Sequence, residues 1–305
     1  MWFAAAVGSA LLFGLAGWWM KVSQMRSGSS NYLLLGLYLS GTAGFGVHAA
    51  LEHSLAVSLT DVRVWMAGLL IGAGSALGNV LFMKALEYGP ASLTSPLTNM
   101  NIVLVIALGT FVYHEPLGTM EFIGVVLLLA AVVLVSIRGR EKLSITQNKW
   151  YLYVGLSIIL FAIRNGGLKV TGDWGLSSAP VLFVSYAISI LWFAYAALMD
   201  HKRLASGGAA SVPADAASVE RSAAASNPTR TGLLLGLLAG LFSYGGLQLY
   251  AVALQTGQAN IAGPIFAANS LVVAAGSIVL YRERLTVLQW AAFILMIAGL
   301  VLIRA

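Results

Sequence analysis

The sequence predicts an all-α membrane protein with ten transmembrane helices, arranged as two inverted-topology repeats of five. Three observations predict this fold: the composition, the spacing of the apolar runs, and the similarity between the two halves. Of the 305 residues, 59% are hydrophobic and 9% are charged, whereas soluble domains carry about 45–50% apolar and about 25% charged residues. This composition argues against a secreted enzyme, a monotopic protein or a nucleic-acid-binding domain. The net charge of +6 fits loops that face anionic lipid.

Ten apolar runs, bounded by charges or by Gly, Pro and Asn clusters, have the length of a membrane span, which is about 20 residues. Backbone groups must be hydrogen-bonded internally in hydrocarbon, and the alternation of barrel strands is absent, so these runs are predicted to be helices. They lie at about 2–20, 31–51, 64–86, 91–112, 119–137, 151–169, 179–199, 231–254, 259–281 and 285–303.

Two further stretches and the lack of cysteine complete the outline. The first apolar run has no basic segment before it and reaches Trp18, so it is predicted to be a retained helix rather than a signal peptide. The stretch 200–230 is rich in Ala and Ser and predicts a flexible loop. Because the chain has no cysteine, disulfides and thiolate metal sites are excluded.

The two halves of the chain repeat each other. A shift of 168 residues aligns 68–137 with 236–305 without a gap, and about 22 of the 70 pairs are identical. Five helices per copy is an odd number, so the second copy enters the membrane upside down. The predicted domains are 1–140, then 141–199 together with 231–305, with the loop 200–230 between helices seven and eight. At the front of each half the shift is 148, and the matches include Ser9 with Ser157, Phe13 with Phe161, Lys21 with Lys169 and Tyr38 with Tyr186.

Short motifs recur in both halves at the entry to the fourth and fifth helices. Gly89-Pro90-Ala91 precedes Pro96, Gly257-Gln258-Ala259 precedes Pro264, and a Tyr-x-Glu-x-Leu step begins at Tyr113 and at Tyr281. With these motifs the chain resembles the two EamA domains of the drug/metabolite transporter (DMT) superfamily. The resemblance implies a ten-helix transporter whose cavity is lined mainly by helices 1, 3, 4, 6, 8 and 9, with relatives that export amino acids or other small metabolites.

Arg164 is the first candidate for substrate binding. It lies near the middle of the sixth helix beside Asn165, and Ala16 and Gly17 replace the pair in the first helix. A charge in mid-membrane is costly and favours a functional role, the binding of a carboxylate or phosphate through the guanidinium fork. The alternative is a buried salt bridge with Glu52 or Glu87.

Polar and aromatic side chains on helices 3, 4, 8 and 9 are further candidates for lining a cavity. The alternative for them is interhelical hydrogen bonding. Together with Arg164 and Asn165, the predicted substrate-binding set is Asn79, Phe82, Ser95, Asn99, Tyr244, Gln248, Tyr250 and Phe266.

Coupling and hinge residues are predicted from spacing and from proline. His48 and Glu52 share a helix face at i, i+4 and suit proton coupling, with interfacial solvation as the alternative; a metal site is not predicted. Pro96 and Pro264 are candidate hinges, with a packing kink as the alternative. Glu115 is expected to favour the N-terminus of the helix that follows it.

These features predict a secondary active transporter or exporter of small polar metabolites that works by alternating access around a central cavity in mid-membrane. Amino-acid-like compounds are the predicted substrates. Transport is predicted to be driven by the substrate gradient or by protons. The protein is expected to be a multi-pass protein of a bacterial-type inner (plasma) membrane and a monomer or homodimer, with no cofactor and no nucleic-acid partner. One alternative is an exporter of choline-like amines or cationic drugs through an aromatic cage of Trp18, Trp19, Trp192, Tyr244, Tyr250 and Phe266. Another is a polytopic membrane enzyme or lipid flippase; motifs of nucleophilic or nucleotide-dependent enzymes are absent, so no enzyme is expected.

The distribution of basic residues predicts the orientation. About three Lys and Arg residues fall on the side of the termini and about thirteen on the other side. This asymmetry places both termini outside, whereas relatives are often described with both inside.

Overall fold

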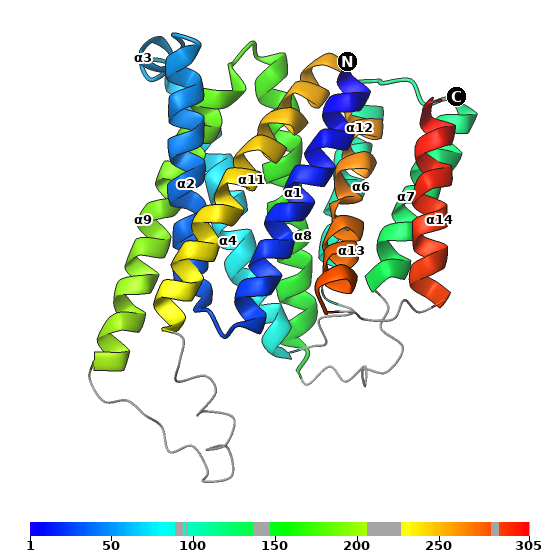
Figure 1. The fold of residues 1–305 in the computed structure, drawn as a ribbon. Coiled ribbons are helices and arrows are strands. Elements are labelled where there is room, and N and C mark those ends of the chain that lie inside the picture. Colours follow the sequence, from blue (N-terminus) through cyan, green and yellow to red (C-terminus); the bar gives the residue numbers. More distant parts are fainter. Residues whose placement is uncertain (89–93, 95–96, 137–146, 206–226, 282–286, 305) are drawn as a thin grey trace.

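The computed structural model describes residues 1–88, 94, 97–136, 147–205, 227–281 and 287–304. Within this part of the chain every regular element is a helix (Figure 1). The elements are α1 (Trp2–Met25), α2 (Ser30–Leu51), α3 (Leu55–Ser58), α4 (Val62–Tyr88), α6 (Asn101–Ala107), the π-helix η1 (Leu108–Val112), α7 (Thr119–Ser136), α8 (Lys149–Asp173), α9 (Ser178–Ala205), α11 (Pro228–Thr256), α12 (Ala259–Ala267), α13 (Asn269–Tyr281) and α14 (Val287–Arg304).

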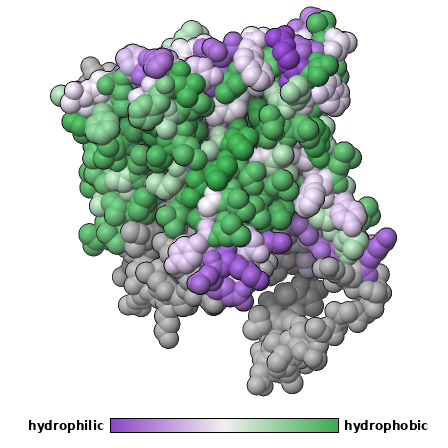
Figure 2. Space-filling view, turned by 180° about the vertical axis from the view of Figure 1, so that it is seen from behind, coloured by the Kyte–Doolittle hydropathy of each residue, from purple (hydrophilic) through white to green (hydrophobic). Residues whose placement is uncertain are grey.

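Among the described residues, six helices are long and apolar enough to cross a membrane: α1, α2, α4, α8, α9 and α11. The other four predicted spans coincide with shorter apolar helical segments of the described chain, namely Leu97–Val112, Thr119–Leu134, Ala259–Val273 and Trp290–Ile303. On the face seen in Figure 2, hydrophobic side chains form a broad band between two ends at which hydrophilic residues gather. The chain is therefore a multi-pass integral membrane protein.

Local sequence signals fix several helix ends. Asn227 caps α11: its side-chain oxygen accepts a hydrogen bond from the backbone N–H of Thr229 (3.2 Å), and Pro228 occupies the first turn. After α8 the chain reverses at Gly175, whose φ of +70° is the left-handed conformation that glycine adopts without strain. The capping of α7 differs from the prediction, because Glu121 rather than Glu115 accepts the backbone N–H of Gly118 (2.8 Å).

The long helices pack in a pattern of matched pairs. Helix α11 packs on α1 and α2, while α4 packs on α8 and α9; α2 also contacts α9, and α7 contacts α14. Small residues let the backbones approach closely: a Cβ added at Gly36 of α2 would lie 2.5 Å from the carbonyl oxygen of Leu233 on α11. Both chain ends lie at the same end of the molecule (Figure 1).

The segment after α11 contains a break. Helix α12 ends at Ala267, which places Pro264 within it, and α13 begins at Asn269. Asn269 donates a side-chain hydrogen bond to the carbonyl of Phe266 (2.8 Å), and Asn101, its partner in the 168-residue alignment, donates to the carbonyl of Thr98 (2.7 Å). Discontinuous helices at the bilayer midplane are a feature of transporters. Pro96 lies outside the described residues.

Candidate functional site

A cavity of about 170 Å³ lies between α1, α2, α4, α6, α8, α9, α11 and the broken segment α12–α13. This volume is below the roughly 300–1,000 Å³ of pockets for drug-sized ligands, so the cavity suits a small metabolite. Its lining is aromatic and neutral polar with one cation: Phe13, Met20, Leu37, Tyr38, Ser75, Asn79, Phe82, Thr98, Asn99, Asn101, Ile102, Phe161, Arg164, Asn165, Tyr186, Ser243, Phe266, Ala267 and Asn269.

Arg164 is the charged side chain of this lining. Its guanidinium carbon lies 5.3 Å from the ring centre of Phe13 and 5.4 Å from that of Phe161, two residues that occupy equivalent positions in the two halves. The Nε donates to the Oδ1 of Asn165 (3.1 Å). Among the described residues, none of the ion pairs involves Arg164. The guanidinium thus keeps its positive charge available to the cavity.

The predicted salt-bridge partners of Arg164 do not account for its position. Glu52 instead contacts His48, with 3.1 Å between Oε1 and Nε2. The side chain of Glu87 lies outside the described residues.

Two tyrosines frame the cavity in equivalent ways. The Tyr38 hydroxyl is hydrogen-bonded to the Ser75 hydroxyl (2.7 Å), and the Tyr186 hydroxyl to that of Ser243 (2.8 Å). The Asn79 amide also donates to the Tyr38 oxygen (3.0 Å). The sequence analysis did not select the two tyrosines as site residues, although their match at a shift of 148 was the signal that could have found them.

Six of the ten predicted substrate-binding residues line this cavity: Asn79, Phe82, Asn99, Arg164, Asn165 and Phe266. Ser95 lies outside the described residues. The remaining three lie elsewhere: Tyr244 is hydrogen-bonded to His48 Nδ1 (2.9 Å), the Gln248 amide donates to the Ser178 hydroxyl (3.2 Å), and Tyr250 is buried behind the cavity.

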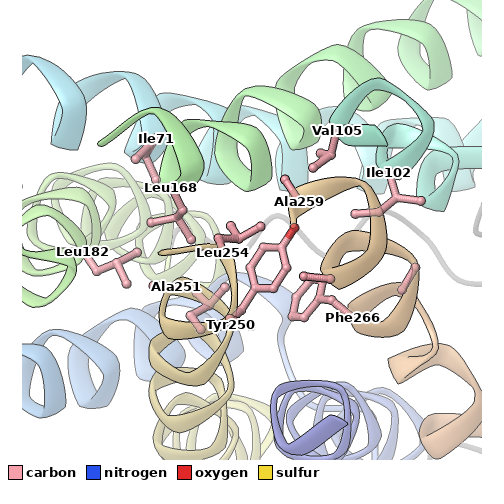
Figure 3. Close-up of a cluster of buried hydrophobic side chains, with 14 of the residues drawn as sticks. Ile71, Ile102, Val105, Leu168, Leu182, Tyr250, Ala251, Leu254, Ala259 and Phe266 are labelled. Atoms are coloured by element: carbon pink, nitrogen blue, oxygen red, sulfur yellow. The ribbon is translucent and has the colours of Figure 1, made fainter. Parts of the chain in front are cut away.

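Tyr250 packs on Phe266, which is a lining residue of the cavity. Their rings stack with centroids 4.2 Å apart (Figure 3). The Tyr250 ring lies in a hydrophobic cluster with Leu254 and Ala259. The cavity is therefore separated from the beginning of α12 by packed side chains.

The six aromatic residues predicted as a cage for cations do not gather around one site, although Tyr250 and Phe266 stack on each other. Trp18 and Trp19 contact each other at 4.8 Å, whereas Trp192 on α9 is 47% exposed on the outer surface. Of the six cage residues, Phe266 alone is among the lining residues given above. The cavity also holds the cation Arg164, which repels cationic ligands. The geometry does not support a cage built from this set.

A second polar cluster joins the loop after η1 to the second half of the chain. Glu115 and Lys169 form an ion pair (2.9 Å) and are only 9% and 15% exposed. Glu115 also accepts the backbone N–H of Asn260 (3.0 Å) in the first turn of α12, so it caps that helix rather than the one that follows it in sequence. Burial raises the pKa of the Tyr113 phenol, whose ring lies 5.4 Å from the Lys169 ammonium.

The position of Lys169 at a helix end, equivalent to that of Lys21, predicts a side chain that reaches the membrane interface, whereas the structure shows it bound within the protein. Its ammonium also donates to the Leu254 carbonyl (3.2 Å). Glu283, the counterpart of Glu115 in the 168-residue alignment, lies outside the described residues.

Comparisons with known proteins agree on the kind of protein. Residues 1–137 match the EamA-like transporter family. One curated relative is a probable 4-amino-4-deoxy-L-arabinose-phosphoundecaprenol flippase subunit ArnE of Pseudomonas fluorescens (strain Pf0-1), 28% identical over 106 residues, which are 34% of this chain and 93% of the relative. A second, of the same printed name from Enterobacter sp. (strain 638), is 27% identical over 72 residues, 24% of this chain and 65% of the relative.

A solved crystal structure shares the fold over nearly the whole chain. The TM-score is 0.69 at 14% sequence identity, and the match covers 96% of each chain. At this identity the likeness concerns the fold alone.

Proposed function

We propose, for a multi-pass membrane protein whose residues 1–137 belong to the EamA-like transporter family, that the whole chain is a secondary transporter of small polar metabolites with an anionic group. Amino-acid-like compounds are the leading class. The transport cycle is alternating access around the central cavity, with the ten spans acting as two inverted repeats, 1–140 and 141–305 without the loop 200–230. A bacterial-type inner membrane is the proposed location.

The packing of the helices supports the two-repeat arrangement. In the alignment of the two halves, α1 corresponds to α8, α2 to α9 and α4 to α11. The packing of α11 on α1 and α2 therefore has its equivalent in the packing of α4 on α8 and α9. The hydrogen bond between Tyr38 and Ser75 likewise corresponds to that between Tyr186 and Ser243. Such equivalence is what inverted repeats require for two alternative access states.

The observation that carries the substrate class is the charge of the cavity. Arg164 is its cation, and the other polar lining residues among those described are uncharged amides and hydroxyls. A guanidinium with free N–H groups binds a carboxylate or phosphate through two parallel hydrogen bonds. The amides and hydroxyls can bind the remaining polar groups of a small ligand.

A ligand-binding test of Arg164 uses thermal stability of the purified protein, because a bound ligand stabilises the folded state by mass action. The panel contains amino acids, phosphorylated metabolites and quaternary amines. We expect anionic ligands to raise the melting temperature of the wild type, Arg164→Ala to abolish the rise, and Arg164→Lys to weaken it. Arg230→Ala, which removes an exposed cation, is the matched control.

Three outcomes of that panel would change the proposal. Full stabilisation of Arg164→Lys would reduce the role of Arg164 to charge alone. Unchanged stabilisation of both variants would exclude Arg164 from the site. Stabilisation by quaternary amines alone would replace the substrate class.

A second candidate is translocation of a lipid-linked sugar phosphate. The printed names of the two curated relatives favour it, and an apolar groove of about 400 Å³ between α4, α6 and α8 could accommodate part of a hydrocarbon tail outside the polar cavity. Reconstitution into vesicles distinguishes the two, since the first predicts uptake of water-soluble solute and the second predicts movement of a labelled polyprenyl phosphate between leaflets.

Proton coupling at His48 and Glu52 is part of the first proposal. The imidazole bridges the Glu52 carboxylate and the Tyr244 hydroxyl, with distances of 3.1 Å and 2.9 Å. Histidine is the side chain that changes charge near neutral pH, and here a change of charge would alter a contact between α2 and α11.

A further inference from the structure

Asn165 lies between the cation of the cavity and the start of α6. Its side chain is buried, with 2% exposure. Its Oδ1 accepts from Arg164 Nε (3.1 Å), and its Nδ2 donates to Asn101 Oδ1 (2.8 Å). Both ends of the amide are therefore engaged by protein, and Asn165 has a positioning role instead of the direct substrate contact predicted from sequence.

The direction of this hydrogen-bond chain is fixed at both ends. The guanidinium of Arg164 can only donate, so Asn165 must present its oxygen to it and its NH₂ group to Asn101. Asn101 then presents its oxygen to Asn165 and donates to the backbone carbonyl of Thr98 (2.7 Å), which can only accept. The chain thus ties the orientation of the guanidinium to the backbone turn that precedes α6.

The neutrality of Asn165 also matters for the cavity. A carboxylate of the same size at this position would accept the same hydrogen bond, but it would cancel the charge of Arg164. An amide orients the guanidinium and leaves its charge for a ligand.

We propose that Asn165 is the positioning residue that sets the charge selectivity of the site, by holding Arg164 in place without neutralising it. This inference rests on the proposed anion site at Arg164.

The test measures binding of inorganic phosphate, L-alanine and L-alaninamide to the purified full-length protein by thermal shift and calorimetry. Asn165→Asp is isosteric and changes the charge. We expect it to lower the affinity for phosphate by about tenfold or more, close to the loss in Arg164→Ala, a factor that corresponds to about 1.4 kcal/mol. We also expect it to remove the preference for L-alanine over L-alaninamide, which differ at the carboxylate. The unliganded melting temperature should fall somewhat, because a carboxylate cannot donate to the Asn101 oxygen, so affinities are compared at a temperature where both proteins are folded.

A matched pair of variants tests orientation separately from charge. Asn165→Ala removes the side chain that holds Arg164. Asn269→Ala removes the counterpart of Asn101 in the other half: Asn269 lines the same cavity and donates to a nearby backbone carbonyl in the same way, but it is not part of the hydrogen-bond chain to Arg164. We expect Asn165→Ala to weaken phosphate binding several-fold and Asn269→Ala to weaken it less, because the second variant removes a lining amide but leaves Arg164 held by Asn165.

The outcomes separate this inference from the proposed function. Wild-type selectivity in Asn165→Asp, or equal losses in Asn165→Ala and Asn269→Ala, would overturn the role of Asn165 while leaving the anion site in place. Wild-type affinity in Arg164→Ala, or no binding of phosphate or L-alanine to the wild type, would overturn the anion site itself.

Discussion

Polar side chains inside this protein fall into two groups, those committed to other residues and those that face the cavity. His48, for example, has both ring nitrogens within hydrogen-bond distance of protein groups, Glu52 on its own helix and Tyr244 on α11. Such a residue cannot reach a ligand without breaking a contact between helices. A change in its protonation would therefore act on the arrangement of the helices.

If His48 couples transport to protons, its replacement should change the pH dependence of transport more than its maximal rate. We expect His48→Gln to flatten the dependence of the transport rate on pH, because it removes the ionisable group that bridges α2 and α11. Uptake by proteoliposomes at a series of internal and external pH values measures this. His53→Asn is the control, because His53 is exposed and its φ of 52° is a conformation that asparagine tolerates. Equal flattening in both variants, or in neither, would speak against coupling at His48.

An individual site residue could be predicted from the sequence where it differed in kind from the residue at the equivalent position of the other half. Arg164 stands out because its counterpart is a small residue, and the structure places it in the cavity. Tyr38 and Tyr186 follow the repeat and were not selected from the sequence, yet both line the cavity. Their contacts with serines on other helices depend on packing over long sequence distances, and a helical pattern does not contain that information.

At the scale of elements, the ion pair between Glu115 and Lys169 links parts that are distant in the chain. It fastens the loop after η1 to α8, and through Asn260 to the first turn of α12. The sequence predicted a cap at the nearest helix because neighbours in sequence are the only partners that it identifies. The partner is set by tertiary packing.

Removal of this ion pair should destabilise the protein. Because both groups are largely buried, we expect Lys169→Met to lower the free energy of unfolding by about 3 kcal/mol. Glu115→Ala should cost more, since it also leaves the Asn260 N–H without its acceptor, and the double variant should cost less than the sum. Denaturant titration in detergent gives these values.

The exposed pair of Asp61 and Arg63 is the matched control for that cycle. Arg63 is 60% exposed, and exposed pairs contribute about 0–1 kcal/mol. Arg63→Gln should therefore have little effect on stability. A loss as large as that of Lys169→Met would show that burial is not what distinguishes the two pairs.

For the whole molecule, the helices of the described residues confirm the prediction of a helical membrane protein. The match of residues 1–137 to the EamA-like transporter family confirms the predicted resemblance. Composition and the lengths of the apolar runs were sufficient for this prediction, because they indicate whether a segment lies in lipid or in water. They do not determine which side of the membrane each end occupies. That depends on the charges that flank the spans.

The charge count predicts both termini outside the cell. The absence of cysteine allows single-cysteine labelling on an otherwise natural chain. We expect a membrane-impermeant maleimide to label Thr60→Cys, at the end that carries the termini, in intact spheroplasts, and to label Arg26→Cys, at the opposite end, only after lysis. The reverse pattern would place the termini inside.

The position of Arg164 between Phe13 and Phe161 also bears on the direction of transport. These rings are equivalent members of the two halves, and the guanidinium lies at nearly the same distance from each, 5.3 Å and 5.4 Å. Under the proposed inverted-repeat arrangement, a charge held between equivalent side chains of the two halves would present the same surroundings to a ligand arriving from either compartment. The resting affinities on the two faces would then be similar, and the sign of net flux would follow the gradients supplied by the cell.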